Sequence, residues 1–200
     1  MLQTTTARST HDSAAIRVAR RAHSSHIDLR QCIRVATWNV LTLNGTSYQT
    51  ALVQELEKYN IAIAGLTEAR SQDSDLSTVD GATFLHFIGH DRTIGVALVL
   101  SHLFNDALAT WQPTSSWLLS AGLIHHHGHL SVIVGYAPTE EAADADKDAF
   151  YNDLASVIES VSTHDNLLML DDFNTVTGPW SAFYEDVVGP FGVCWPIWCR

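Results

Sequence analysis

The stretch that decides the fold lies between residues 32 and 66, where CIRVATWNV (32–40), QTALVQELEKY (49–59) and IAIAGL (61–66) follow one another. The first and third segments are short and apolar, as strands buried in a sheet are. The middle segment places Leu52, Val53, Leu56 and Tyr59 on one side of a helix, because residues three or four apart share a helical face. The order strand, helix, strand predicts a β-α-β unit.

The chain beyond this unit continues as short apolar segments and one longer helical pattern. Segments typical of strands occupy residues 81–88, 94–100, 107–111, 118–124, 130–136 and 167–170. Residues 142–161 carry apolar side chains at helical spacing and predict a helix. We therefore expect a mixed α/β fold and neither a helix bundle nor a repeat array.

Length and composition limit the class of protein. The chain has 200 residues, of which 46% are hydrophobic, enough to bury the core of one domain and to exclude a chain that is disordered throughout. No uninterrupted apolar run approaches the roughly 18 residues that a membrane-spanning helix needs. We expect a globular protein that is not integral to a membrane.

The charge is distributed unevenly along the chain. Residues 1–31 contain five Arg and two Asp, a net charge of +3. Because the whole chain has a net charge of −11, the remaining residues have a net charge of −14. A body with few Lys and Arg gains little from counterion release, so chemistry on a nucleic acid would need the help of a cation. Residues 1–31 predict a disordered basic tail, with an organelle transit peptide as the alternative.

Three cysteines, Cys32, Cys194 and Cys199, have no regular spacing. An odd count of this kind argues against a disulfide framework. We expect an intracellular protein, with the nucleus as one candidate compartment.

Polar residues stand where the predicted strands end. Asn39 closes the first strand, Glu68 follows the second, Tyr136 ends the strand over 130–136, and Asp172 and Asn174 follow the last. Such positions are free to converge on a ligand in an open α/β sheet. Two carboxylates and two amides suit a hard cation such as Mg²⁺ better than Zn²⁺, and phosphate chemistry is the natural use of that ion.

Five motifs occur in the order seen in the endonuclease/exonuclease/phosphatase family. They are TWNV (37–40), LTEAR (66–70), IGVA (94–97), GYAPT (135–139) and DFN (172–174). Over residues 34–192 the chain resembles this family, and in particular the endonuclease domains of LINE-type retrotransposons. The resemblance implies a sandwich of two mixed β-sheets flanked by helices. It also implies hydrolysis of a nucleic-acid phosphodiester, DNA being the expected partner, with Mg²⁺ as cofactor and Mn²⁺ as the alternative.

The resemblance also implies a role for each residue at the strand ends. Glu68 would bind the metal ion, with Asn39 supporting the metal and the phosphate. Asp172 would orient or deprotonate the attacking water, and Asn174 would donate hydrogen bonds to the phosphate. The Tyr136 hydroxyl would stabilise the transition state as a hydrogen-bond donor.

Three departures from the family pattern bear on activity. Asp171 stands where the family has glycine, which brings like charge near Asp172. Trp117 and Leu118 stand where we expect an arginine that would contact phosphate. The family continues beyond residue 192 to strands with a final Asp-His pair, whereas residues 194–200 read CWPIWCR. We expect a partial domain over 32–193 that is incomplete at its C-terminus, followed by an atypical end over 194–200.

Other interpretations stay open. Taken singly, Asn39 is a common turn residue, Glu68 a loop acid, Tyr136 a packed aromatic, and Asp172 with Asn174 a cap. The histidines at 125, 126, 127 and 129 favour an exposed turn over a transition-metal site. A catalytically inactive remnant or binding module is the main functional alternative, and a phosphatase of a small or lipid phosphate is another.

Overall fold

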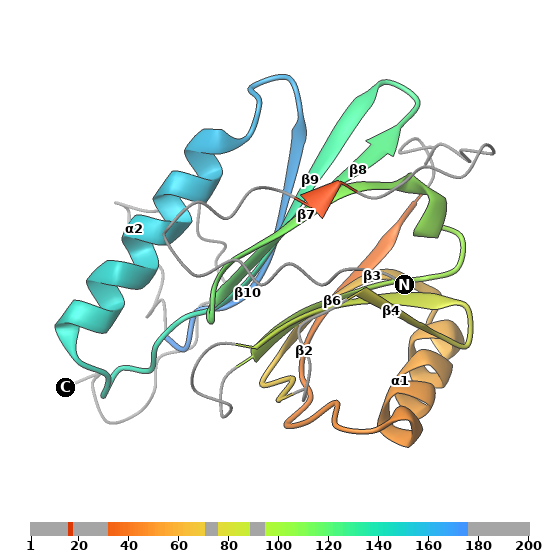
Figure 1. The fold of residues 1–200 in the computed structure, drawn as a ribbon, viewed down its shortest axis with the longest axis horizontal. Helices are drawn as coiled ribbons and strands as arrows, with labels where there is room; N and C mark the ends of the chain where they lie inside the picture. Colours follow the sequence, from red (N-terminus) through yellow and green to blue (C-terminus); the bar gives the residue numbers. More distant parts are fainter. Residues whose placement is uncertain (1–15, 18–31, 71–75, 89–94, 176–200) are drawn as a thin grey trace, which may run out of the picture.

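Two five-stranded β-sheets pack face to face in the computed structural model, which describes residues 16–17, 32–70, 76–88 and 95–175 (Figure 1). One sheet has the order β1 (Ile16–Arg17), β7 (Leu108–Ser115), β8 (Leu118–His125), β9 (Gly128–Tyr136) and β10 (Asn166–Asp172). The other has the order β2 (Arg34–Asn39), β3 (Ile61–Thr67), β6 (Gly95–Leu100), β5 (Ala82–Ile88) and β4 (Leu76–Val79). Both sheets are mixed, because β9 with β10 and β2 with β3 pair in parallel and their other pairs are antiparallel.

Helices lie on the outside of the sandwich. Helix α1 (Thr46–Lys58) packs on the sheet of β3, and α2 (Asp144–Ser160) packs on the sheet of β7 and β8 (Figure 1). A short 3-10 helix, η1 (Asn105–Ala107), precedes β7. Neither α1 nor α2 is long and apolar enough to cross a membrane, and the described residues contain no other α-helix.

The predicted fold class is confirmed. The β-α-β unit forms as β2, α1 and β3, and each predicted strand is found with bounds shifted by a few residues. The strand β4, with the sequence LSTV, was not predicted because two apolar residues in four give no clear alternation. The end segment 194–200 and most of the predicted tail lie outside the described residues; within that tail, β1 pairs with β7.

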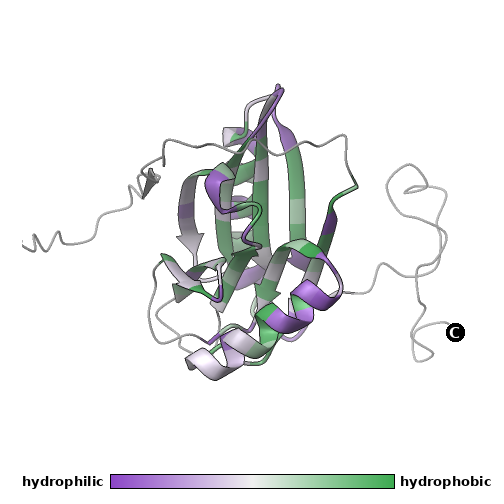
Figure 2. Cartoon of the chain, turned by 90° about the vertical axis from the view of Figure 1, so that its right-hand side faces the viewer, coloured by the Kyte–Doolittle hydropathy of each residue, from purple (hydrophilic) through white to green (hydrophobic). Residues whose placement is uncertain are grey.

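Apolar side chains fill the space between the sheets, and the central strands are hydrophobic along most of their length (Figure 2). Members of this core come from both sheets, among them Ile63, Leu98, Val132 and Leu170, each at most 4% exposed. A second cluster lies between α1 and its sheet, and a third lies under α2. The two sheets therefore share one core, which fixes how their strand ends face each other.

The sheets come very close together at Gly65 in β3. A Cβ atom placed on Gly65 would lie 2.6 Å from the Cβ of Leu170 in β10 and 3.4 Å from its carbonyl oxygen. Real Cβ atoms do not approach this closely, so a side chain at position 65 would push β10 away. The glycine thus sets the separation of two strands whose ends carry Glu68 and Asp172.

A second glycine makes room for Asp171. Asp171 pairs with Gly135 across β10 and β9, and a Cβ on Gly135 would lie 2.7 Å from the Asp171 carboxylate. Both carboxylate oxygens are covered and make no hydrogen bond of good geometry to a described residue. Burial raises the pKa of Asp171 to about 6, and the charge of Asp172 adds to this, while the backbone N–H of Asp172 offsets it only in part. Asp171 is therefore accommodated at the cost of a poorly solvated carboxylate.

Replacing Gly65 with alanine is expected to destabilise the protein by about 1–3 kcal/mol, the usual cost of overpacking a core. Chemical denaturation would measure this change in the free energy of unfolding. Gly122→Ala is the matched control, because the new Cβ there would meet the Thr110 hydroxyl, which can rotate away. Equal losses in the two variants would contradict a specific close approach at Gly65.

Replacing Asp171 with asparagine is expected to stabilise the protein above pH 6 and to change little below pH 4. The pKa of Asp171 in the folded chain, about 6, exceeds its ordinary value of 3.8, so ionisation costs stability progressively between these values and fully above them. Because the residue is only half-buried, we expect a gain of about 1–2 kcal/mol. Unfolding of Asp171→Asn at pH 4 and pH 7.5 tests this, with the exposed Asp148→Asn as control. A gain that does not depend on pH would contradict the assignment.

Candidate active site

The polar residues predicted from the strand ends come together at one edge of the sandwich. Asn39 is the last residue of β2 and pairs with Thr67, after which Glu68 follows. On the opposite sheet, Asp172 is the last residue of β10 and pairs with Tyr136, the last residue of β9. Because both pairs are parallel, all four strands deliver their carboxyl ends to this edge.

Glu68 lies at the centre of a hydrogen-bonded cluster. Its Oε1 accepts bonds from Asn39 Nδ2 at 2.7 Å and from the Tyr136 hydroxyl at 3.3 Å. Its Oε2 pairs with Arg70 Nη2 at 2.8 Å. The Asn39 bond lowers the pKa of Glu68, with smaller contributions from Tyr136 and Arg70, against a rise caused by burial. Glu68 is therefore ionised at neutral pH.

Tyr136 links the two sheets through its bond to Glu68 and is held in place by Trp117. Its ring stacks on Trp117, with centroids 5.9 Å apart and planes inclined by 22°, and its backbone N–H donates to the Trp117 carbonyl oxygen. Burial raises the pKa of Tyr136, and the nearby charge of Glu68 raises it further. Its hydroxyl thus keeps its proton at neutral pH and remains a donor. Trp117, which stands where an arginine was expected, serves to orient this tyrosine.

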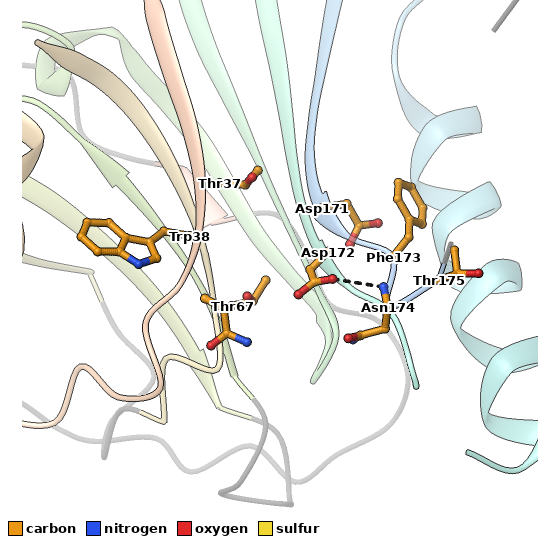
Figure 3. Close-up of a pocket in the computed structure, with 9 residues that line it drawn as sticks. Thr37, Trp38, Thr67, Asp171, Asp172, Phe173, Asn174 and Thr175 are labelled. Carbon is orange, nitrogen blue, oxygen red and sulfur yellow. Dashed lines mark hydrogen bonds between the residues drawn. The ribbon is translucent and has the colours of Figure 1, made fainter. Parts of the chain in front are cut away.

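Asp172 is held by the residues that follow it. The Asn174 backbone N–H donates to Asp172 Oδ1 at 3.1 Å, and the Asn174 side chain donates to the Ala137 carbonyl oxygen at 2.6 Å. The Ala137 N–H in turn donates to the Asp172 carbonyl oxygen. Figure 3 shows Asp172 and Asn174 linked in this way beside the end of β10. Asn174 here fixes Asp172, and its predicted bond to a phosphate stays a prediction.

A pocket of about 390 Å³ opens between the ends of β2 and β10, and neither Glu68 nor Tyr136 lines it. Its walls include Asn39 and Thr67 from one sheet and Asp172 and Asn174 from the other (Figure 3). Thr67 is 2% exposed, and its hydroxyl has no hydrogen-bond partner among the described residues. The hydroxyl oxygen itself is covered, and a buried hydroxyl without a partner costs free energy.

Three of the six residues other than glycine that have a positive φ in the described part of the chain follow β3 or β10. Glu68, Arg70 and Asn174 have φ values of 54°, 41° and 47°, in the left-handed region that residues other than glycine seldom adopt. Each lies in the loop that follows β3 or β10. Strained residues persist where the surroundings over-determine them and are common at functional sites.

The donor set suits a hard divalent cation, although no three His, Cys, Asp or Glu side chains form a metal-binding group in the described part of the chain. Mg²⁺ is commonly held by one or two carboxylates and several waters. The Glu68 carboxylate is an oxygen ligand of this kind, and Asp172 supplies another from the pocket. Asn39 turns its amide nitrogen to Glu68 and its oxygen to the Leu41 N–H, so in this structure it holds Glu68 in place. The predicted Mg²⁺ stays a prediction.

Sequence reasoning missed three contributors to the site. Arg70 was part of a motif, but its ion pair with Glu68 forms in a turn where both residues have a positive φ, and the sequence does not predict that turn. Nothing in the sequence singled out Thr67 from the residues around it. Trp117 was noted only because it stands where an arginine was expected. The sequence signal for Trp117 was limited to an aromatic residue directly before β8, the strand that pairs with the strand of Tyr136.

The histidine cluster forms the turn between β8 and β9 and holds no metal-binding group in the described residues. His126, His127 and His129 are exposed, as expected for a turn, whereas His125 is 7% exposed. His125 Nδ1 accepts the His127 backbone N–H at 3.1 Å. The expectation of an exposed turn is therefore wrong for His125, which stabilises the turn from inside.

No protein-family model matches the sequence. Craniofacial development protein 2 of Bos taurus is 28% identical over 162 residues, which are 80% of this chain and 26% of the relative. The same protein of Tragulus javanicus is 27% identical over 178 residues, which are 86% of this chain and 30% of the relative. The chain thus spans less than a third of the length of these relatives.

Solved structures share the fold at low sequence identity. AP endonuclease LMAP from Leishmania major aligns with a TM-score of 0.57 and 15% identity, covering 81% of this chain and 61% of that one. The endonuclease domain of the retrotransposon TRAS1 aligns with a TM-score of 0.54 and 14% identity, covering 72% and 62%. The human nocturnin catalytic domain gives 0.54 and 18%, covering 74% and 66%. The chain therefore has the endonuclease/exonuclease/phosphatase fold and is similar in sequence to part of craniofacial development protein 2.

Proposed function

We propose that the protein hydrolyses a phosphodiester bond of a nucleic acid with the help of Mg²⁺. The observation that carries this proposal is the pocket that Asn39 lines from one sheet and Asp172 from the other, next to Glu68, which bonds to Asn39 and to Tyr136. Two of the structural relatives are endonucleases by name. Their low identity supports the fold alone, so the chemistry is argued from the residues.

The residues divide the work according to their environments. Glu68, ionised and held by Asn39, would be the main metal ligand. Bound there, Mg²⁺ would offset negative charge on the phosphate oxygens as a Lewis acid. Asp172 is free to accept a proton from the attacking water, because its known hydrogen bond from Asn174 uses one oxygen. The protonated Tyr136 hydroxyl would donate to the oxygen on which charge develops.

A phosphatase acting on a small phosphate ester is the second candidate. It is favoured by the net charge of −11, because an acidic protein gains little from binding a long polyanion. Substrate choice separates the two functions. A nuclease should cleave an oligonucleotide and leave a small phosphate monoester intact, whereas the phosphatase should hydrolyse the monoester and leave the oligonucleotide intact.

Loss of either acidic group is expected to abolish metal-dependent cleavage. Glu68→Gln and Asp172→Asn keep the shape of each side chain but remove the charge, and should lower the rate by roughly 10²–10⁴-fold. Labelled single-stranded and duplex DNA, with Mg²⁺ or EDTA, would be the substrates. Glu159→Gln on the exposed side of α2 is the matched control. A folded parent protein that cleaves neither substrate would contradict the proposal and favour the inactive remnant or binding module.

Replacing Thr67 with valine is expected to separate stability from activity. The change removes a buried hydroxyl that has no partner among the described residues, so the free energy of unfolding should rise by about 1 kcal/mol. Cleavage should fall if that hydroxyl contacts the substrate or its water. Thr83→Val, at a buried threonine in β5, is the control and should leave cleavage unchanged. Unchanged cleavage in Thr67→Val would contradict a role for this hydroxyl.

A further inference from the structure

A second hollow lies next to the candidate active site, on the side of β2 that faces α1. It measures about 340 Å³, and we call it the aromatic groove. Residues that line it include Trp38, Leu41, Tyr48, Ala51, Leu52 and Glu55. The groove thus combines two aromatic rings with aliphatic side chains, and contains one acidic group.

The aromatic groove is continuous with the candidate active site. Trp38 and Asn39 line both hollows, and β2 is an edge strand in the described part of its sheet. Successive side chains of a strand point to opposite faces. Trp38 accordingly points away from Asp172 and Asn174, while its own backbone borders their pocket (Figure 3). One ligand can therefore pass over the edge of β2 from the pocket into the groove.

Large apolar side chains are left open to solvent here. Trp38 is 46% exposed, Tyr48 58% and Leu41 62%. Leu41 has a φ of 61°, and a bond of 2.7 Å from the Thr42 N–H to the Val40 carbonyl oxygen closes a tight turn around it. A left-handed leucine is strained. The loop is thus held in a costly conformation that displays an apolar side chain beside the site, as functional loops often are.

The chemistry of the groove favours a flat, uncharged ring. No Lys or Arg is among the residues that line it, and its one acid, Glu55, pairs with Lys58 at 3.2 Å. A phosphate would find no cation among the lining residues, whereas any nucleobase presents a π-face that stacks on Trp and Tyr. In a duplex that face is covered by neighbouring base pairs, so the base in the groove must be unpaired.

We propose that the aromatic groove binds an unpaired nucleobase adjacent to the phosphate in the candidate active site, which makes single-stranded nucleic acid the substrate class. The inference rests on the proposed function for the location of that phosphate. Base stacking on Trp38 and Tyr48 supplies the affinity that an acidic surface cannot draw from phosphate contacts.

Fluorescence anisotropy of the full chain with short labelled oligonucleotides tests this inference in EDTA, so that binding is measured without cleavage. The probes are a single-stranded DNA, an abasic strand of the same length and charge, and the matching duplex. The intact protein should bind the single strand best. Trp38→Leu and Tyr48→Leu should each weaken that binding by about five-fold or more, the loss of a stacked base, and should leave the weak binding of the abasic strand unchanged.

Two further variants keep the test specific. Tyr48→Phe retains the ring and should bind as the parent does. Tyr59→Leu removes a tyrosine of similar exposure, 56%, that follows the other end of α1 and lies outside both hollows, so binding should not change. Equal affinity for the abasic strand, preference for the duplex, or a Tyr59→Leu loss as large as that of Tyr48→Leu would each overturn the inference.

This test is independent of the proposed hydrolysis. Base-dependent binding by a protein that cleaves nothing would support the aromatic groove and refute the enzyme. Metal-dependent cleavage that is unaffected in Trp38→Leu and Tyr48→Leu, with no preference for the single strand over the abasic strand, would support the enzyme and refute the groove.

Discussion

The close approach of β3 and β10 at Gly65 and Leu170 is the constraint on which the rest of the structure depends. These strands belong to different sheets, and their packing sets the distance across the sandwich. Glu68 comes three residues after Gly65, and Asp172 comes two residues after Leu170. A strand is nearly rigid over so few residues, so the spacing of the two carboxylates follows from a contact in the core. The distance between Glu68 and Asp172 therefore depends on position 65 having no side chain.

Glu68, Tyr136 and Asp172 are each held by neighbouring residues of the candidate site. Arg70 lies against Glu68, Tyr136 stays protonated, and the Asn174 N–H binds Asp172. These contacts hold each group in place before a ligand arrives, which reduces the reorganisation that a reaction requires. The cost of the left-handed conformation at Glu68 and Arg70 is offset by β3, which precedes them and is buried from Ile63 to Thr67. A rigid sheet edge can carry strained loops that an isolated loop could not maintain.

Most of the fold and the named site residues could be predicted because they are encoded locally. Apolar runs mark the strands, and a polar residue at the end of a predicted strand marks Asn39, Glu68 and Asp172. What could not be predicted depends on partners distant in sequence. Asp171 is tolerated because Gly135 lies opposite it, and Trp117 matters because it stacks on Tyr136. His125 is buried because a hairpin turn folds over it. None of these pairings leaves a periodic signal in the chain.

The net negative charge of the chain and the aromatic groove both bear on how this protein could bind a nucleic acid. A protein with a net charge of −11 cannot hold a polyanion by long-range attraction, so affinity must come from short-range contacts. Stacking is such a contact, since it depends on surface area and not on the sign of a charge. Trp38 and Asn39 place an apolar surface and a polar one on adjacent positions of β2. Because consecutive residues of a strand face opposite ways, an edge strand can present a base-binding surface and a phosphate-binding surface side by side. With the function proposed above, that geometry would let an acidic protein select a nucleotide by its base, while Glu68 and a bound cation would offset the charge of its phosphate.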